Sequence, residues 1–346
     1  MKSSEIFFRE PMLSKYINSA AAEDTEEAYR AAFLAQSMGC DMIDVNGSST
    51  KVIQAAVEGR NQALLYVQRR KPPMLIMASL TPPEANDLHA QKATLRQSTC
   101  RACGQCEKAC PNNALTLVSG GVHLETTRCR GCRHCAQVCP DDNFRFQTMP
   151  TPPLHKAVPA ALAAGAEAIE LHFSGMPAGD IRRRLRELET LLGGVVLSVC
   201  LGSQQSSPRE LIAAARAVAE QRNGRLTFIQ ADGSTMTGTT HGFSALSTAE
   251  IILSQQLPNL RVICSGGCGP QTWKFVREAG LPIAGIGMGI AMRECVKHLL
   301  DAPDLTSNPD LWRDAEQIHR AIVAGTVKRE GNRKILGAAL QLVANQ

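Results

Sequence analysis

Eight of the thirteen cysteines in this 346-residue sequence form two copies of one spacing. Each copy reads C-x₂-C-x₂-C-x₃-C-P, so that a proline directly follows the fourth cysteine. The first copy contains Cys100, Cys103, Cys106 and Cys110, and the second contains Cys129, Cys132, Cys135 and Cys139. Thiolates at this spacing are ligands by which proteins hold [4Fe–4S] clusters. The pattern therefore predicts two clusters and a role in handling electrons.

Paired runs of this kind share their ligands, because the fourth cysteine of each run serves the other cluster, as in two-cluster ferredoxins. We expect one cluster on Cys100, Cys103, Cys106 and Cys139, and a second on Cys110, Cys129, Cys132 and Cys135. Structural zinc and disulfides are the alternative uses of such cysteines. Zinc is disfavoured because two C-x-x-C knuckles would leave cysteines over at the wrong spacing.

The whole chain is too long to be a small ferredoxin alone, so the cysteine runs must belong to something larger. The net charge of +5 is modest, and acidic and basic residues are interspersed, which gives no reason to expect a nucleic-acid partner. The sequence has no run of about 18 apolar residues and no apolar signal region near its start. We therefore expect a soluble protein with no membrane span, in the cytoplasm or, in a photosynthetic eukaryote, the plastid stroma.

Short apolar runs alternate with helical periodicity on both sides of the cysteine-rich region. We predict strands at residues 15–20, 42–45, 74–79, 168–172, 195–200, 227–231, 261–264 and 283–286. We predict helices at residues 25–38, 50–70, 155–164, 180–192, 208–222, 247–256, 270–279 and 288–299. Repeated helix, glycine and buried strand is typical of a parallel sheet with right-handed crossovers. Eight such units favour a closed (β/α)₈ TIM-like barrel over an open doubly wound sheet.

The expected domain order places the cysteine runs inside the barrel sequence. Residues 1–95 form the first three barrel strands, 96–149 a ferredoxin-like insert, 150–300 the remaining strands, and 301–346 a helical extension. Proline-rich segments flank the insert on both sides. Connections that follow barrel strands open at the carboxyl face, where barrel enzymes place their chemistry. The clusters should therefore lie over that face.

Glycines follow the last two predicted strands, where barrels commonly grip a phosphate through backbone amides. The candidate residues are Ser265, Gly266, Gly267, Gly285, Gly287 and Gly289. They resemble the phosphate grip of flavin-binding barrels such as dihydroorotate dehydrogenases and dihydrouridine synthases, which would make FMN or another phosphate-bearing small molecule the ligand. Simple tight turning is the alternative explanation of these glycines.

Three further residues are candidates for catalysis at the barrel mouth. Asp232 ends a strand and could act as a base, although Asp before Gly is also a plain turn. His172 could transfer protons or could only bond a backbone carbonyl. Cys268 stands between two glycines ahead of a predicted helix, whose N-terminus could stabilise its thiolate, while the other free cysteines read as buried apolar residues. Whether the barrel is an enzyme stays open.

The chain also resembles the light-dependent period protein family of cyanobacteria and their plastid-bearing relatives. The resemblance rests on the two cysteine runs and on four segments in matching order, namely DMIDV at 41–45, AIELH at 168–172, QADGSTMTG at 230–238 and SGG at 265–267. It implies an iron–sulfur protein that senses the cellular redox state and passes it to a regulatory partner such as a circadian clock. An electron donor or acceptor protein would be the other partner.

Two rival functions remain. In one, the clusters ferry electrons to FMN in the barrel of a flavin-dependent oxidoreductase, although no lysine of the kind that grips flavin follows the barrel strands. In the other, the barrel is a non-catalytic scaffold for a partner protein. The extension, with Trp312 and a group of basic residues, is expected to pack under the barrel or to dock a partner. The basic residues are Lys328, Arg329, Arg333 and Lys334.

Overall fold

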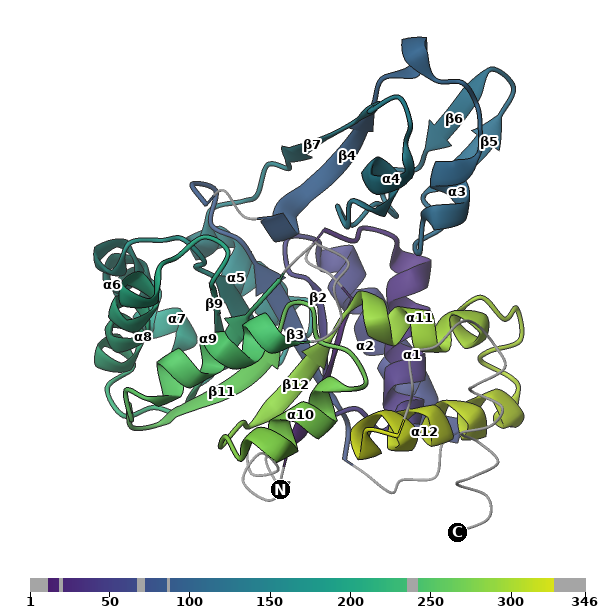
Figure 1. The fold of residues 1–346 in the computed structure, drawn as a ribbon. Helices are drawn as coiled ribbons and strands as arrows, with labels where there is room; N and C mark the ends of the chain where they lie inside the picture. The colour runs from purple at the N-terminus through teal and green to yellow at the C-terminus, as the bar shows by residue number, and fades with distance from the viewer. Residues whose placement is uncertain (1–11, 19–20, 67–71, 86–87, 235–241, 327–346) are drawn as a thin grey trace.

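The computed structural model describes residues 12–18, 21–66, 72–85, 88–234 and 242–326. In these residues, eight parallel strands close into a barrel in the order β1-β12-β11-β10-β9-β8-β3-β2 (Figure 1). The strands are β1 (Leu13–Ile17), β2 (Met42–Asn46), β3 (Leu75–Leu80), β8 (Ala168–His172), β9 (Val196–Gly202), β10 (Thr227–Asp232), β11 (Leu260–Ser265) and β12 (Gly285–Met288). The predicted (β/α)₈ barrel is confirmed.

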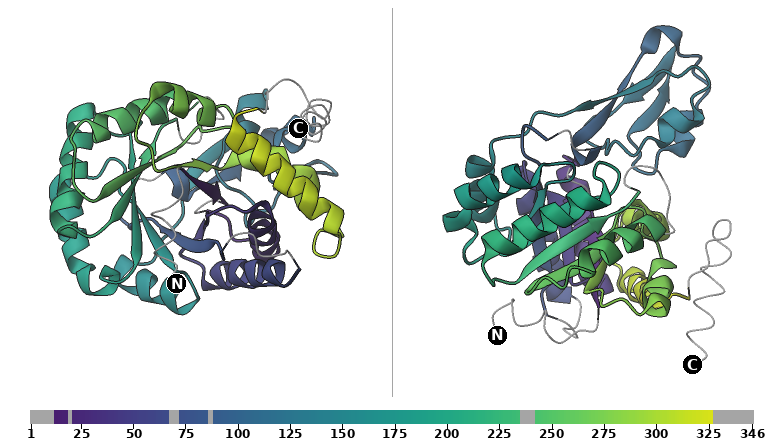
Figure 2. Two further views of the ribbon diagram at one scale, coloured as in Figure 1. Left: turned by 90° about the horizontal axis from the view of Figure 1, so that it is seen from below. Right: turned by 60° about the vertical axis from the view of Figure 1, so that its left-hand side comes forward.

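Helices surround the strands, as the left-hand view of Figure 2 shows. They are α1 (Thr25–Met38), α2 (Thr50–Tyr66), α5 (Leu154–Ala163), α6 (Ala178–Glu187), α7 (Glu189–Leu192), α8 (Pro208–Arg222), α9 (Phe243–Leu253), α10 (Thr272–Ala279) and α11 (Ile290–Leu300). Each predicted helix has its counterpart here. The ends of the first predicted strand, at 19–20, and of the second predicted helix, at 67–70, lie outside the described residues.

Local sequence sets the helix ends. At the start of α8, the Ser207 hydroxyl accepts a hydrogen bond from the Glu210 backbone N–H, and the Glu210 carboxylate accepts one from the Ser207 N–H at 2.7 Å. This reciprocal capping satisfies two amides that a helix N-terminus otherwise leaves without partners. At the start of α1, the Asp24 carboxylate caps the Glu27 N–H at 3.0 Å. The same end of α1 faces the insert.

The insert contains two short antiparallel sheets and two short helices. Strand β4 (Gln91–Leu95) pairs with β7 (Phe144–Thr148), and β5 (Leu115–Val118) pairs with β6 (Gly121–Leu124). Helices α3 (Gln105–Ala109) and α4 (His134–Val138) each contain the third cysteine of a run, Cys106 and Cys135. The small sheet starts at Gln91, ahead of the boundary at residue 96 expected from the sequence. Figure 1 shows the insert standing on one end of the barrel, near α1 and α11.

The described part of the extension packs on the barrel helices. Its helix α12 (Pro309–Ala324) lies against α1, and the ring of Trp312 is 5.7 Å from the rings of Phe33 and Tyr66. The basic residues expected to mark this extension, from Lys328 onward, lie outside the described residues. No helix in the described ranges is both long enough and apolar enough to span a membrane.

Close contact between α1 and α2 depends on Gly59. A Cβ atom there would lie 2.1 Å from the Tyr29 carbonyl oxygen, which belongs to backbone and cannot swing away. We expect Gly59→Ala to lower the free energy of unfolding by about 1–3 kcal/mol, the usual cost of overpacking, although alanine favours helices over glycine. Denaturant unfolding followed by circular dichroism would measure this.

The matched control for that variant is Gly179→Ala in α6, where an added Cβ meets nothing within 4 Å. This change should leave stability unaltered or slightly raised. Equal stability of the two variants would show that α1 and α2 can separate without cost.

Candidate functional site

Two small cavities lie in the insert, and each is lined by four cysteines together with apolar residues. The first contains Cys100, Cys103, Cys106 and Cys139 in its lining. The second contains Cys110, Cys129, Cys132 and Cys135. Each lining takes three cysteines from one run and the fourth from the other, which is the combination expected from the spacing. Among the described residues, no three His, Cys, Asp or Glu side chains converge to hold a single metal ion.

Backbone geometry directs amides at the cysteine sulfurs. The N–H groups of Ala114 and Asn143 point at Cys110 Sγ and Cys139 Sγ, at 3.3 and 3.5 Å. These two contacts occupy corresponding places in the two runs. Such amides stabilise the thiolate form of a ligand and tune a bound cluster. A glycine is needed in one loop, because a Cβ at Gly131, whose φ is +66°, would lie 2.3 Å from the Gln91 carbonyl oxygen.

The electrostatics of the second cavity favour a cationic occupant. Burial, and then the neighbouring thiols, raises the pKa of Cys135 to about 12. Burial likewise raises the pKa of Cys132 to about 11, against the hydrogen bond that its sulfur receives from the His134 backbone. Several thiolates in one small space therefore need compensating positive charge, which iron ions supply when they bind. The four-cysteine cavities thus fit iron–sulfur clusters.

The two cavities differ in their exposure. Cys103 in the first is exposed, and two apolar side chains of the insert also face solvent, with Leu117 43% and Val138 36% exposed. In the second cavity, Cys129, Cys132 and Cys135 are all buried. The first cavity therefore lies toward the free surface of the insert, and the second does not.

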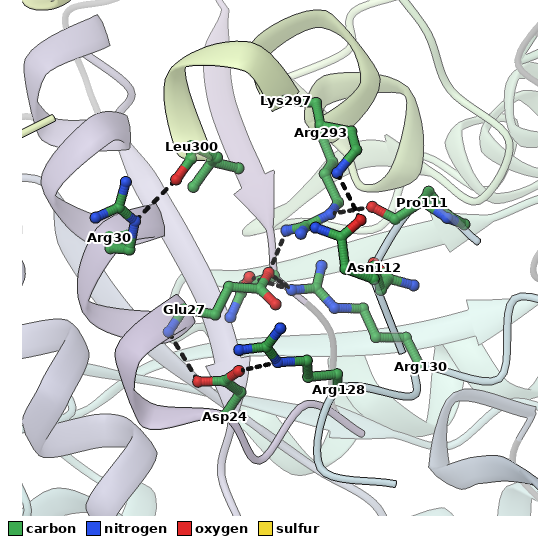
Figure 3. Close-up of polar contacts among 12 residues, drawn as sticks. Asp24, Glu27, Arg30, Pro111, Asn112, Arg128, Arg130, Arg293, Lys297 and Leu300 are labelled. Atoms are coloured by element: carbon green, nitrogen blue, oxygen red, sulfur yellow. Dashed lines mark hydrogen bonds and ion pairs between the residues drawn. The ribbon is translucent and has the colours of Figure 1, made fainter. Parts of the chain in front are cut away.

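The loops that carry the cysteines of the second cavity contact the barrel, and Figure 3 shows Pro111 and Arg130 beside Arg293 and Glu27. Arg293 on α11 donates from Nε to the carbonyl oxygen of Pro111 at 2.7 Å, directly after Cys110. Arg130, which lies between Cys129 and Cys132, donates to Asn18 Oδ1 at 2.9 Å. The loops of the second cavity are thus fixed to the barrel.

One carboxylate joins these contacts, because both Arg130 and Arg293 form ion pairs with Glu27 on α1. The two arginine side chains are 5% and 3% exposed, so the pairs are shielded from solvent. Arg128 and Asp24 add a more exposed pair at 2.8 Å. A polar cleft of about 390 Å³ opens beside this junction between the first turns of α1, the end of α11 and the loop at 111–113.

The predicted phosphate-binding glycines occupy the ends of β11 and β12. Gly266 and Gly267 have φ values of +68° and +79°, and α11 begins directly after Gly289. Gly285 has a packing role, because a Cβ there would lie 2.6 Å from the Leu13 carbonyl oxygen on the neighbouring strand. Gly287 is similarly close to Ile17, at 2.9 Å. Ser265, which precedes these glycines, is buried. Residues 235–241, which include the end of the QADGSTMTG segment, lie outside the described residues.

The three predicted catalytic candidates are all buried but are not equivalent. Asp232 ends β10, and His172 ends β8 with its Nε2 atom 2.7 Å from Ser79 Oγ. Cys268 is fully buried, and burial raises the pKa of its thiol well above the usual range, with Cys264 and Asp232 adding to the effect. Its environment therefore favours the thiol over a reactive thiolate.

Sequence reasoning missed a buried ionic network inside the barrel. Lys15 donates from Nζ to Glu170 Oε2 at 2.6 Å and to Gln230 Oε1 at 2.7 Å, and lies 3.0 Å from Asp44 Oδ2. Ser198 also donates to Glu170, at 2.7 Å. None of the three charged side chains is more than 2% exposed. Lys15 is thus held by three acceptors from three other strands.

These charges set the protonation of the network. Burial alone lowers the pKa of Lys15, but Asp44 and Glu170 outweigh burial and raise it, so the ammonium persists. Burial would raise the pKa of Glu170, but Lys15 and His172 together hold it well below its usual range. Burial raises the pKa of Asp44 to about 6, against the opposing effect of Lys15. Asp44 is therefore the carboxyl group that can take up a proton near neutral pH.

The signal for this network was present in the sequence. The strands LSKYI at 13–17, MIDVN at 42–46 and AIELH at 168–172 each carry one charged residue in the middle of an apolar run. A charge in the middle of an apolar strand of a closed barrel must be paired, because burying an isolated charge is costly. Three such strands of mixed sign therefore indicate a common interior ion pair.

Comparison with known proteins supports this description in part. Residues 99–143 match the family model described as a 4Fe-4S dicluster domain. The insert is thus an iron–sulfur domain of the electron-transfer type, and the chain is an iron–sulfur protein. No curated protein matches the chain.

Several solved structures are similar to the chain, and three of them carry names of different activities. The YdjI aldolase from Escherichia coli K12 is 9% identical, with a TM-score of 0.45 over 99% of this chain and 94% of that one. A dihydrodipicolinate synthase from Rhodopseudomonas palustris is 9% identical, with a TM-score of 0.40 over 96% and 97%. The (S)-3-O-geranylgeranylglyceryl phosphate synthase from Thermoplasma acidophilum is 12% identical, with a TM-score of 0.43 over 94% and 99%. At this level of identity the likeness concerns the fold alone.

The raised pKa of Asp44 leads to a testable pH dependence. The native state should retain a proton on Asp44 up to about pH 6, whereas the unfolded chain releases it near pH 4. Stability contributed by this group therefore falls as the pH rises from about 4 to 6. Infrared difference spectra should show a protonated carboxyl C=O band that titrates near pH 6 and disappears in Asp44→Asn.

The control variant is Asp310→Asn, because Asp310 is an exposed carboxylate on α12. It should leave the band unchanged. A band that persists in Asp44→Asn would assign the proton to another member of the coupled network.

Proposed function

We propose that this chain is an electron-transfer or redox-sensing protein that carries two [4Fe–4S] clusters, with the barrel serving as the part that responds to the second cluster. The observation that carries the proposal is the presence of two four-cysteine cavities, of which the first includes an exposed cysteine and the second has loops fixed to the barrel. The cavity linings support the ligand sets predicted from the sequence, with Cys139 in the first set and Cys110 in the second. Bound clusters supply a one-electron reservoir in each cavity.

The residues around the cavities support a direction for electron flow. The exposed Cys103 and the apolar surface at Leu117 and Val138 give an electron-donating or electron-accepting protein a place to approach the first cluster. Around the second cavity, Arg130 and Pro111 fix the loops to barrel residues. Electrons that enter at the surface of the insert would therefore end next to the barrel.

The barrel beneath the second cluster has properties suited to a response. Its interior holds one ammonium group against two carboxyl groups, and the pKa of Asp44 lies close enough to neutrality for proton uptake. The resemblance to light-dependent period proteins supports a regulatory partner, such as a component of a circadian clock, as the reader of this state. We propose redox sensing on these grounds.

Ligand sharing between the runs gives a sharp test of the two-cluster proposal. Cys106→Ser with Cys139→Ser removes two ligands of the same predicted cluster and should leave one intact cluster, or about half the iron and sulfide. Cys106→Ser with Cys110→Ser removes one ligand from each and should damage both. Iron and sulfide analysis with electron paramagnetic resonance of the reduced protein distinguishes the two results. Circular dichroism should show the barrel still folded in both variants.

Equal losses in the two double variants would contradict the proposed sharing. A single cluster in the wild-type protein would contradict the count of two.

A second candidate function is a flavin-dependent oxidoreductase, in which the clusters pass electrons to FMN in the barrel. The observation that favours it is the pair of left-handed glycines, Gly266 and Gly267, beside the start of α11. Against it, all three contacts of Lys15 are made to the protein itself, which leaves this ammonium occupied. The glycine pair therefore has to bind the phosphate without help from a barrel lysine.

Visible spectra of the anaerobically purified protein separate the two functions. We expect the broad absorbance of iron–sulfur clusters and no flavin after acid release. Stoichiometric FMN, lost in Gly267→Asp because the added charge repels a phosphate, would favour the oxidoreductase instead.

A further inference from the structure

Both cysteine runs have an arginine after their first cysteine, but they differ in the residue that follows the closing Cys-Pro pair. Arg101 directly follows the first cysteine of the first run, and Arg130 directly follows the first cysteine of the second. The residue after the closing Cys-Pro pair, in contrast, is Asn112 in the first run and Asp141 in the second. The shared ligands bring Arg101 together with Asp141 around the first cavity, and Arg130 together with Asn112 around the second.

Around the first cavity, the arginine and the acid form a closed pair within the insert. Arg101 Nε donates to Asp141 Oδ2 at 2.8 Å, and its Nη2 donates to Oδ1 at 2.6 Å. This two-point geometry is the strongest arrangement that the two side chains offer. The charge of Arg101 is therefore compensated without any barrel residue.

Around the second cavity, the corresponding acid is missing. The Asn112 Nδ2 atom faces Cys132 Sγ at 4.0 Å, and its Oδ1 atom is buried without a hydrogen-bond partner. Arg130 turns instead to the barrel, where it pairs with Glu27 and donates to Asn18. The Arg130 side chain is 5% exposed, against 65% for Arg101. A buried arginine of the insert thus takes its carboxylate from α1.

We propose that Glu27 is the barrel-supplied counterpart of Asp141, a positioning residue that sets the charge around the second cluster and hence its reduction potential. The inference rests on the proposed function, because it presumes a cluster on Cys110, Cys129, Cys132 and Cys135. Reduction adds one electron, and thus one negative charge, to that site. Arginines near the site stabilise this charge, and a carboxylate opposes it.

Burial of the charges around Glu27 determines how large the shift in reduction potential should be. Glu27 compensates two arginines, Arg130 and Arg293, and both are shielded from solvent, so their charges act at low dielectric. Loss of the Glu27 charge should favour the reduced cluster by on the order of tenfold, which is about 59 mV for a one-electron couple. The first cluster, whose arginine pairs with Asp141 inside the insert, is not expected to respond to Glu27.

The test is a redox titration of the full chain with dithionite as the reductant and soluble mediators. Electron paramagnetic resonance monitors each cluster during the titration. Glu27→Gln should raise the midpoint potential of the second cluster and leave that of the first unchanged. Asp141→Asn should raise the midpoint potential of the first cluster and leave that of the second unchanged. Glu26→Gln, on the same turn of α1 but exposed, is the matched charge control and should shift neither by a comparable amount.

The assignment of each midpoint comes from single-cluster backgrounds. Protein with Cys106→Ser and Cys139→Ser should retain only the second cluster, and there Glu27→Gln should show its full shift. Adding Asn112→Asp to Glu27→Gln supplies the missing acid within the insert and should return the potential toward the wild-type value. A merely structural role for Glu27 would not produce this rescue.

Unchanged midpoints in Glu27→Gln, with iron and sulfide contents at the wild-type level, would overturn the inference while leaving the two-cluster function standing. Equal shifts of both clusters would overturn it as well. Wild-type protein with fewer than two clusters would instead overturn the proposed function.

Discussion

Because all the strands of the barrel run parallel, their carboxyl ends lie at the same end of the barrel. A segment inserted after β3 must therefore begin and finish at that end, whatever its own fold. The insert cannot avoid the mouth of the barrel, nor the first turns of α1 and α11, which start there as well. The contacts of Arg130 and Arg293 with Glu27 exist because this connectivity brings their three elements together.

Buried charge is distributed in two unbalanced groups. Inside the barrel, Lys15 faces two carboxyl groups, so negative charge is in excess when both are ionised. At the junction, two arginines face the single carboxylate of Glu27, so positive charge is in excess. An unbalanced buried group is costly unless something else compensates it. In the barrel, a proton on Asp44 can do so, and at the junction the negative charge of a thiolate-bound cluster can.

Sequence patterns located the barrel because its strands are buried on both faces and therefore read as apolar runs between glycine-ended helices. They missed β4, since QKATL has neither an apolar run nor a clear alternation. They identified the cysteines because ligand spacing is a local property. The pairing of Arg130 with Glu27 was beyond reach, because 103 residues separate the two and only the closed barrel brings them together. The Lys15 network was visible only as single charges in strands, whose partners depend on strand order.

The unequal partners of Arg101 and Arg130 also bear on how the insert could be used outside this chain. Its outer half is self-sufficient, since Asp141 is part of the same fold. Its inner half is not, because excision would expose Arg130 without its carboxylate and leave Asn112 in the place of an acid. The insert is therefore not a cassette that can be transplanted unchanged. Grafting it onto another scaffold requires either a glutamate on the new scaffold in the place of Glu27 or an aspartate in the insert in the place of Asn112.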